Sequence, residues 1–205
     1  MNLTSSEALA MIKECEKVVE DKHWISHSIN VGNSAKVIAT ALKEKGFDVD
    51  IELAKTLGYI HDIGKYNGES QGHVMRGYHY LKEKGFDEKY YNICLTHSYL
   101  NNDITCTAGK GPDPEDNPIL DEFIKNHIYT LEEKIINLCD LMCTQDGVFT
   151  IDKRMVDLIT RKGAYETTQY HVIETVKLKK YFDDLLGYNL YDLFPEIKEN
   201  LWYDV

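Results

Sequence analysis

The chain has 205 residues, of which 43% are hydrophobic and 28% charged, and its formal net charge is −11. This composition suits one globular domain and excludes a disordered chain. The acidity argues against binding to duplex nucleic acid, which needs lysine and arginine to displace counterions. No apolar run approaches the ~20 residues that span a membrane, and the first residues lack the pattern of a signal peptide. We therefore expect a cytoplasmic protein without membrane association.

Apolar residues recur at helical spacing in almost every segment, which predicts an all-α fold. The first helix is expected over 4–20, where Thr4 and Glu7 form a capping-box pattern. Gly46 and Gly85 would end later helices, because glycine is favoured just after the last helical turn. The further helices expected before residue 100 cover 24–45, 50–62, 72–84 and 88–99.

The second half of the chain is also expected to be helical. Residues 101–118 hold three of the four prolines and are predicted to form a long loop, a kind of segment that often serves as a lid or binding loop. A helix from Thr130 to about Gln145 should follow, and two or three more helices should follow from residue 152 on. Asp146-Gly147 before the letters VFTI is a strand-like fragment.

The five cysteines do not predict a disulfide framework, because their number is odd and no Cys-X-X-Cys pair occurs. Cys139 and Cys143 lie four residues apart within the helix expected after Thr130, so they would share one face. We expect small buried side chains at both positions. A metal-binding or redox role is the alternative.

The pair His61-Asp62 ends an apolar helix in the stretch LGYIHDIGKYNG. Ala54 and Leu57 precede His61 by seven and four residues, so they share its helix face, and that face is apolar. His61 should therefore point toward the core, with Asp62 beside it at the helix end. Two metal-binding side chains could converge there. Taken alone, the pair is better explained by a structural histidine next to a helix-ending aspartate.

Three more histidines are expected to face inward, each from a different helix. Gly77 follows one of them by four residues, and a glycine inside a helix costs about 1 kcal/mol relative to alanine. That cost would be tolerated where another group must approach the helix closely. Singly, each histidine is better explained as a core residue than as a ligand. The three are His27, His73 and His97.

Asp140 changes this balance because its helix, LEEKIINLCDLMCTQ, is apolar on nearly all sides around it. Such a helix is buried, and a buried carboxylate must be protonated, paired or metal-bound. A salt bridge to lysine or arginine is the simpler partner, but four inward histidines favour a metal. Imidazole and carboxylate ligands suit Fe, Mn, Co, Ni or Zn. Six ligands are enough for two ions that share a bridging carboxylate.

These residues resemble the HD-domain superfamily of metal-dependent phosphohydrolases. The matching text is HSINVG at 27–32, LGYIHDIGK at 57–65 and NLCDLM at 137–142. GHVMRG at 72–77 and CLTHS at 94–98 are similar to the additional histidine motifs of binuclear members. The nearest pattern is the bacterial family that hydrolyses diadenosine tetraphosphate symmetrically. The resemblance covers about residues 20–150 and implies a compact helical HD-domain core. Residues 151–205 would form a helical extension, and residues 1–205 together a single domain.

The resemblance implies a metal-dependent phosphohydrolase with two divalent transition-metal ions. A water between the ions would lose its proton near neutral pH and attack the phosphorus of a small phosphorylated substrate, a nucleotide or a related compound. A homodimer is compatible with this activity. The ligands implied are Asp62 as the bridge, His27, His61 and Asp140 on the first ion, and His73 and His97 on the second.

Two basic residues near these ligands are candidates for substrate binding. Lys65, three residues after Asp62, would contact a phosphate oxygen or assist the leaving group; otherwise it is an exposed turn lysine. Arg76 is a second candidate for phosphate contact.

Two other functions remain open. Diiron oxygenases of the same superfamily use the same six-ligand arrangement to cleave C–C or C–P bonds with O₂. Some HD domains are noncatalytic regulatory modules that bind a metal or a nucleotide, although no ligand residue is missing here.

The remaining histidines and the basic residues of the extension have no motif. The histidines are expected to be structural or surface residues: His23, His79, His127 and His171. The basic residues would either line an entrance for phosphate or form a solvated helix face: Lys153, Arg154, Arg161 and Lys162.

Overall fold

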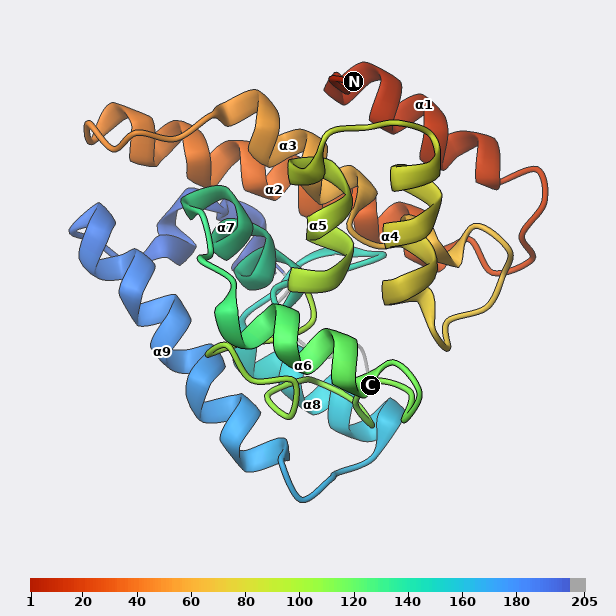
Figure 1. The fold of residues 1–205 in the computed structure, drawn as a ribbon. Coiled ribbons are helices and arrows are strands. Elements are labelled where there is room, and N and C mark those ends of the chain that lie inside the picture. The colour runs from red at the N-terminus through yellow and green to blue at the C-terminus, as the bar shows by residue number, and fades with distance from the viewer. Residues whose placement is uncertain (200–205) are drawn as a thin grey trace.

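The computed structural model describes residues 1–199 and confirms the all-α fold (Figure 1). One short hairpin accompanies the helices. The elements are α1 (Ser5–Cys15), α2 (His23–Glu44), α3 (Ile51–Ile60), a 3₁₀ turn (Ile63–Lys65), α4 (His73–Glu83), α5 (Glu88–Thr96), α6 (Asn117–Asn126), α7 (Leu131–Asp140), β1 (Cys143–Thr144), β2 (Gly147–Val148), α8 (Ile151–Lys162), α9 (Thr168–Leu186), and two 3₁₀ turns (Leu190–Leu193 and Pro195–Ile197).

Helix α2 is the centre of the bundle and packs most extensively against α3, with α7 also against it. Two glycines allow the close approach of α2 and α3, since a Cβ atom on Gly58 would lie 2.5 Å from the Cα atom of Gly32. Helix α1 covers α3, and α4 pairs with α5. This packing brings the ends of several helices to one side of α2.

The predicted helix starts are confirmed where capping side chains were recognised. Thr4 and Glu7 form the capping box of α1, and Thr130 and Glu133 form that of α7. Each pair satisfies two backbone N–H groups that lack a partner within the helix. Asp50 caps α3 by accepting a hydrogen bond from the amide of Leu53.

Two predicted helix ends are wrong by five residues. The helix from Thr130 ends at Asp140, five residues early, because the chain turns there into the β1–β2 hairpin, in which Gly147 has a φ of 135°. Cys143 therefore lies on β1 and does not share a helix face with Cys139, although both side chains are buried. The first helix likewise ends at Cys15 and not near residue 20.

The segment predicted as a long loop is partly helical at its end. Residues 101–116 contain turns, but α6 starts at Asn117 with Pro118 in its first turn, where the missing amide proton of proline costs nothing. The loop is anchored by Cys106, which is fully buried and whose carbonyl accepts a hydrogen bond from the amide of Leu100. It therefore passes over the bundle as an ordered segment.

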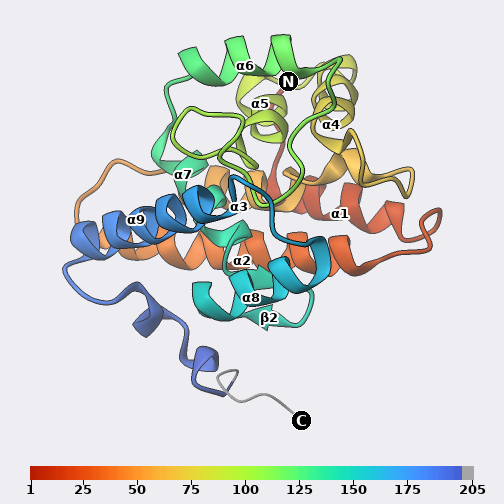
Figure 2. The same ribbon diagram turned by 90° about the horizontal axis from the view of Figure 1, so that it is seen from below.

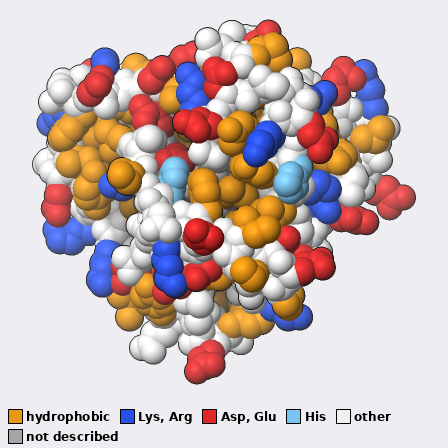
Figure 3. Space-filling view, in the orientation of Figure 1, with side chains coloured by type: hydrophobic (Ala, Val, Ile, Leu, Met, Phe, Trp, Pro, Cys, Tyr) orange, Lys and Arg blue, Asp and Glu red, His pale blue; other side chains and the backbone are white. Residues whose placement is uncertain are grey.

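Helices α8 and α9 form the C-terminal extension, and they end at Gly163 and Gly187. Both lie on the side of the bundle away from α1 (Figures 1 and 2). The face of the molecule in Figure 3 mixes acidic, basic and apolar side chains instead of showing one large patch of a single kind. Within residues 1–199, no helix has the length and hydropathy needed to cross a membrane.

Candidate metal centre

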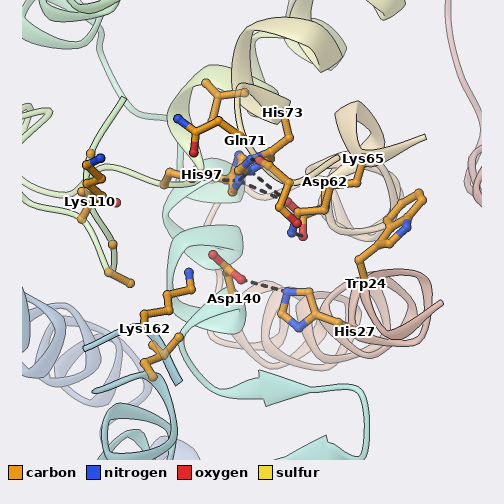
Figure 4. A pocket seen from close by; sticks show the side chains of 18 of the residues that line it. Trp24, His27, Asp62, Lys65, Gln71, His73, His97, Lys110, Asp140 and Lys162 are labelled. Carbon is orange, nitrogen blue, oxygen red and sulfur yellow. Dashed lines mark hydrogen bonds and ion pairs between the residues drawn. The ribbon is translucent and has the colours of Figure 1, made fainter. Parts of the chain in front are cut away.

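The structure brings all six predicted ligand residues together at one place in the bundle (Figure 4). Most of them sit at helix ends: His61 follows the last residue of α3, His97 follows the last residue of α5, His73 begins α4, and Asp140 ends α7. His27 lies in the second turn of α2. Helix ends that meet at one point can present polar groups inside an otherwise apolar core.

The six residues form two groups of three. Within each group, the atoms that could bind a metal lie within 4.8 Å of one another. In the first group, Nε2 of His27 donates to Oδ1 of Asp140 at 2.9 Å. Nε2 of His61 lies 3.8 Å from the same oxygen and 3.6 Å from Oδ2 of Asp62. A metal ion at this position would replace the proton on His27, because imidazole coordinates in its neutral form.

In the second group, the side chain of Asp62 faces two histidines. Its Oδ1 atom lies 3.2 Å from Nε2 of His73 and 3.6 Å from Nε2 of His97. Those two nitrogens lie 3.4 Å apart. Asp62 thus has one oxygen toward each group, which is the position that a bridging carboxylate would occupy.

The hydrogen bonds of the rings fix which nitrogen is available. Nδ1 of His61, His73 and His97 lies 2.7, 2.7 and 3.0 Å from the backbone carbonyls of Gly58, Ser70 and Ile93. A carbonyl only accepts, so each Nδ1 must donate, and each neutral ring keeps its lone pair on Nε2. Metal-binding histidines are commonly oriented in this way.

These lone pairs test whether the residues fit a metal. Nε2 of His61 is buried and has no hydrogen-bond partner among the described residues, which is costly for a polar atom. Nε2 of His73 and Nε2 of His97 face each other and a carboxylate oxygen, so three acceptors converge. The Ser98 hydroxyl, 2.9 Å from Nε2 of His97, can donate to only one of them. A divalent cation satisfies all of them, so the residues fit the metal that the pattern implies.

Burial and charge hold the ligands in the forms that a metal requires. Burial lowers the pKa of His61, and it lowers the pKa of His97 to about 3, so both rings are neutral at neutral pH. Burial acts in the opposite direction on Asp62, but the Lys65 amine and the nearby histidines outweigh it and hold the pKa of this carboxyl well below its usual range. The hydrogen bond from His27 likewise lowers the pKa of Asp140 against the effect of burial.

Lys65 and Arg76 differ in their surroundings. The Lys65 amine forms an ion pair with Oδ2 of Asp62 and lines the cavity beside it. Arg76 donates through Nε to the carbonyl of Gly64 at 2.6 Å and through Nη2 to the carbonyls of Glu69 and Gln71. Its donors thus hold the segment before α4, and its side chain does not line the cavity. Phosphate binding by Arg76 stays a prediction that these contacts do not favour.

The centre opens into a cavity of about 760 Å³, a size typical of small-molecule sites. Asp140 lines it with 24% of its side chain exposed. The aspartate expected to be enclosed by apolar residues therefore faces the cavity from the end of its helix. Loop 101–116 and the C-terminal extension form the opposite wall.

Sequence reasoning missed one residue that supports the centre. Nδ2 of Asn137 donates to the carbonyls of Thr96 and His97, both at 2.9 Å, and its side chain is buried. Asn137 lies one helical turn before Asp140, so α7 carries one predicted ligand and holds the backbone of another. The spacing of Asn137 from Asp140 was the available signal.

The extension contributes further residues that had no motif. Arg154, Arg161 and Lys162 line the cavity, as does His171, whereas Lys153 does not. Arg161 and Lys162 are solvent-exposed as well as lining the cavity, whereas Arg154 is buried and does not belong to a solvated face. His171 is 3% exposed, and burial lowers its pKa to about 4.

Comparisons with known proteins show the family to which the chain belongs. The model of the HD domain family matches residues 24–143. "Uncharacterized protein MJ0778" of Methanocaldococcus jannaschii is 34% identical over 137 residues, which cover 65% of this chain and 72% of that protein. No solved structure was found to match the chain. The family match ends before α8, so the extension lies outside it.

Proposed function

The chain belongs to the HD-domain family, and on that premise we propose that it hydrolyses a phosphate ester or anhydride of a small molecule, with two divalent metal ions held by the six converging residues. The family is one of metal-dependent phosphohydrolases and implies divalent metal binding. The observation that carries the proposal for two ions is the position of Asp62. Its two oxygens face two separate groups of imidazole nitrogens.

The ligand roles in this proposal follow the two groups. His27, His61 and Asp140 would hold one ion, His73 and His97 the other, and Asp62 would bridge them. When bound, the ions supply positive charge for the phosphoryl oxygens and a water whose pKa is lowered toward neutrality. The carbonyl partners of the Nδ1 atoms of His61, His73 and His97 keep the three rings oriented without further change.

Lys65 is proposed as the residue of this chain that contacts the substrate. Its amine lies on Oδ2 of Asp62 at the cavity wall, with 20% of the side chain exposed. Once metal ions share the charge of Asp62, the amine can turn to a phosphoryl oxygen or to the leaving group. A cation there would offset negative charge that develops in the transition state.

The cavity supports a small substrate, and a nucleotide or a related compound fits its volume of about 760 Å³. The residues around the centre are both polar and apolar, and they include Trp24 and Tyr99. Aromatic side chains at a cavity wall could contact a base or another ring system.

The test is a panel of phosphate esters and anhydrides assayed with protein stripped of metal and reloaded with Mn, Fe, Co, Ni or Zn. We expect hydrolysis that requires metal, together with close to two ions per chain by elemental analysis. No activity with any loaded form would overturn the proposal. Oxygen consumption by the iron form would favour the diiron oxygenase, and tight nucleotide binding without turnover would favour a regulatory module.

A further inference from the structure

The cavity has a second wall that the metal centre does not account for. It is formed by residues of α8, α9 and loop 101–116, and the helices lie outside residues 24–143, which the family model matches. Its charged side chains are of both signs, in a chain with a net charge of −11. The cations are Lys110, Arg154, Arg161 and Lys162, the carboxylates are Asp113, Asp116 and Asp157, and the imidazole of His171 also belongs to this wall.

Lys162 is a cation of α8 that lines the cavity on the side of Asp140. Burial lowers the pKa of its amine, and Asp140 is the charged group that acts on it most strongly. Figure 4 shows the side chain directed toward Asp140. Within residues 1–199 its amine has neither an ion pair nor a hydrogen bond, and a Cβ atom on Gly109 would lie 3.9 Å from it.

Lys110 approaches the same cavity from the loop (Figure 4). It too has no carboxylate partner among the described residues. Two amines from separate elements therefore face one cavity. Ammonium groups are strong phosphate binders because each is a compact charge with three donors.

The two arginines of α8 are already partly neutralised. Arg154 donates to Asp157 through Nη1 at 2.5 Å, and Arg161 donates to both oxygens of Asp157 at 2.7 and 2.6 Å. One carboxylate thus serves two guanidinium groups and leaves one positive charge. Arg154 is 8% exposed, and its Nε atom is buried without a partner among the described residues. A buried donor of this kind points to an acceptor that the chain itself does not supply.

His171 adds a second unpartnered polar group. Its ring is 3% exposed, lines the cavity, and makes no hydrogen bond to any residue described in 1–199. Buried imidazoles are normally hydrogen-bonded. As a neutral ring it could donate one hydrogen bond to an anionic oxygen.

We propose that Lys162, Lys110 and His171 form an anion subsite for a second phosphoryl group of the substrate, one that is not held at the metal centre. The inference rests on the proposed phosphohydrolase function and deepens it, because it predicts a substrate with at least two phosphoryl groups. The metal centre would hold the group that reacts, and the extension would hold its neighbour. Lys162 and His171 of the extension, together with Lys110 of loop 101–116, then determine which phosphate compounds are accepted.

A different role for Lys162 must be separated from this one. Its amine could serve only to balance the charge of Asp140. In that case removal of the amine would change the affinity for metal and would weaken the binding of every anion to the same extent. A second-phosphoryl subsite instead distinguishes between ligands that carry one and two such groups.

The test compares methylphosphonate and methylenediphosphonate. Their phosphorus–carbon bonds are not cleaved by phosphate-ester hydrolysis. Full-length protein loaded with Mn²⁺ is titrated by calorimetry, and its metal content is measured again afterwards. We expect the wild-type protein to bind the diphosphonate at least about tenfold more tightly, since two charged groups are held instead of one. Lys162→Met and Lys110→Met should each remove most of that preference and leave methylphosphonate within about twofold.

Lys180→Met is the matched control, because Lys180 is an exposed lysine of α9 that pairs with Asp184 outside the cavity. It should change neither affinity. The subsite would be overturned if Lys162→Met weakened the binding of both ligands equally. It would also be overturned if the wild-type protein showed no preference for the diphosphonate. Circular dichroism of each variant checks its folding. If the protein hydrolyses no compound of the panel but binds the diphosphonate in a lysine-dependent way, the subsite is supported and only the proposed activity is refuted.

Discussion

A Cβ atom on Gly64 would lie 1.9 Å from the carbonyl oxygen of His73 and 2.6 Å from the amide nitrogen of Gly77. The segment that follows Asp62 thus crosses the first turns of α4 at backbone contact. Gly77 also faces Sγ of Cys94, so the predicted close approach to this helix face is confirmed. The contact sets the position of His73 relative to Asp62.

Gly64→Ala should therefore displace α4 and His73. We expect a loss of about 1–3 kcal/mol in the free energy of unfolding, as for other overpacked sites, and a fall of at least about tenfold in affinity for the second metal ion. Urea unfolding and metal titration measure the two effects. Gly109→Ala is the control, since its added Cβ would meet nothing closer than 3.9 Å. An unchanged metal affinity in Gly64→Ala would contradict this role.

Asp62→Ala should abolish metal-dependent hydrolysis, by about 10³-fold or more, because the carboxylate faces both ligand groups. The helical circular dichroism should stay largely intact. Asp48→Ala removes an equally charged but fully exposed side chain and should leave the rate unchanged. Metal analysis of Asp62→Ala should show fewer ions per chain. Hydrolysis at the wild-type rate would refute the bridging position.

Asn137→Ala should weaken the centre without removing any proposed ligand. Two backbone carbonyls, of Thr96 and His97, would lose their buried donor. Unpaired buried acceptors cost about 1–3 kcal/mol, and support lost behind a ligand lowers metal affinity by about 10–100-fold. Thermal unfolding with and without metal separates these effects. A variant destabilised equally in both states would show that Asn137 is structural only.

His171 should make the stability of the metal-free protein depend on pH. Its folded pKa of about 4 lies below the ordinary value of 6.5, chiefly through burial. Between these values the unfolded chain binds a proton that the folded chain does not, so the free energy of unfolding rises with pH. The contribution is fully present above pH ~6.5 and lost as pH falls toward ~4, with a maximum of about 3 kcal/mol.

His171→Gln tests this dependence because glutamine does not titrate. The difference in unfolding free energy between wild type and variant should narrow as pH falls from about 7 to 4. His61 and His97 contribute in the same direction in both proteins, so they cancel in the comparison. A constant difference across this range would mean that His171 is not buried in a neutral form.

Helix starts and the converging residues followed from local patterns in the sequence. Thr4 and Thr130 marked helix starts through capping boxes, and His61 was directed inward by the apolar positions Ala54 and Leu57, both now buried. These signals span a few residues and survive without knowledge of the rest of the fold. The ligand roles themselves remain proposals.

Features that depend on distant contacts could not be predicted. Residue 140 ends α7 because of the hairpin that follows, although the apolar letters LMC continue the helical pattern. Lys162 and His171 become cavity residues only because α8 and α9 fold back over the bundle. Arg76 is drawn to backbone carbonyls of the segment before its own helix.

The contact between His27 and Asp140 joins residues 113 positions apart in the chain. A metal ion held there would connect two segments that are separated by more than half of the polypeptide. A nascent chain that does not yet include Asp140 could not form this site. Loading would then be a late event in biogenesis. Ligand binding to the folded state alone stabilises it by about 2.7 kcal/mol at a hundredfold excess over Kd, so metal supply would also affect the stability of the finished protein.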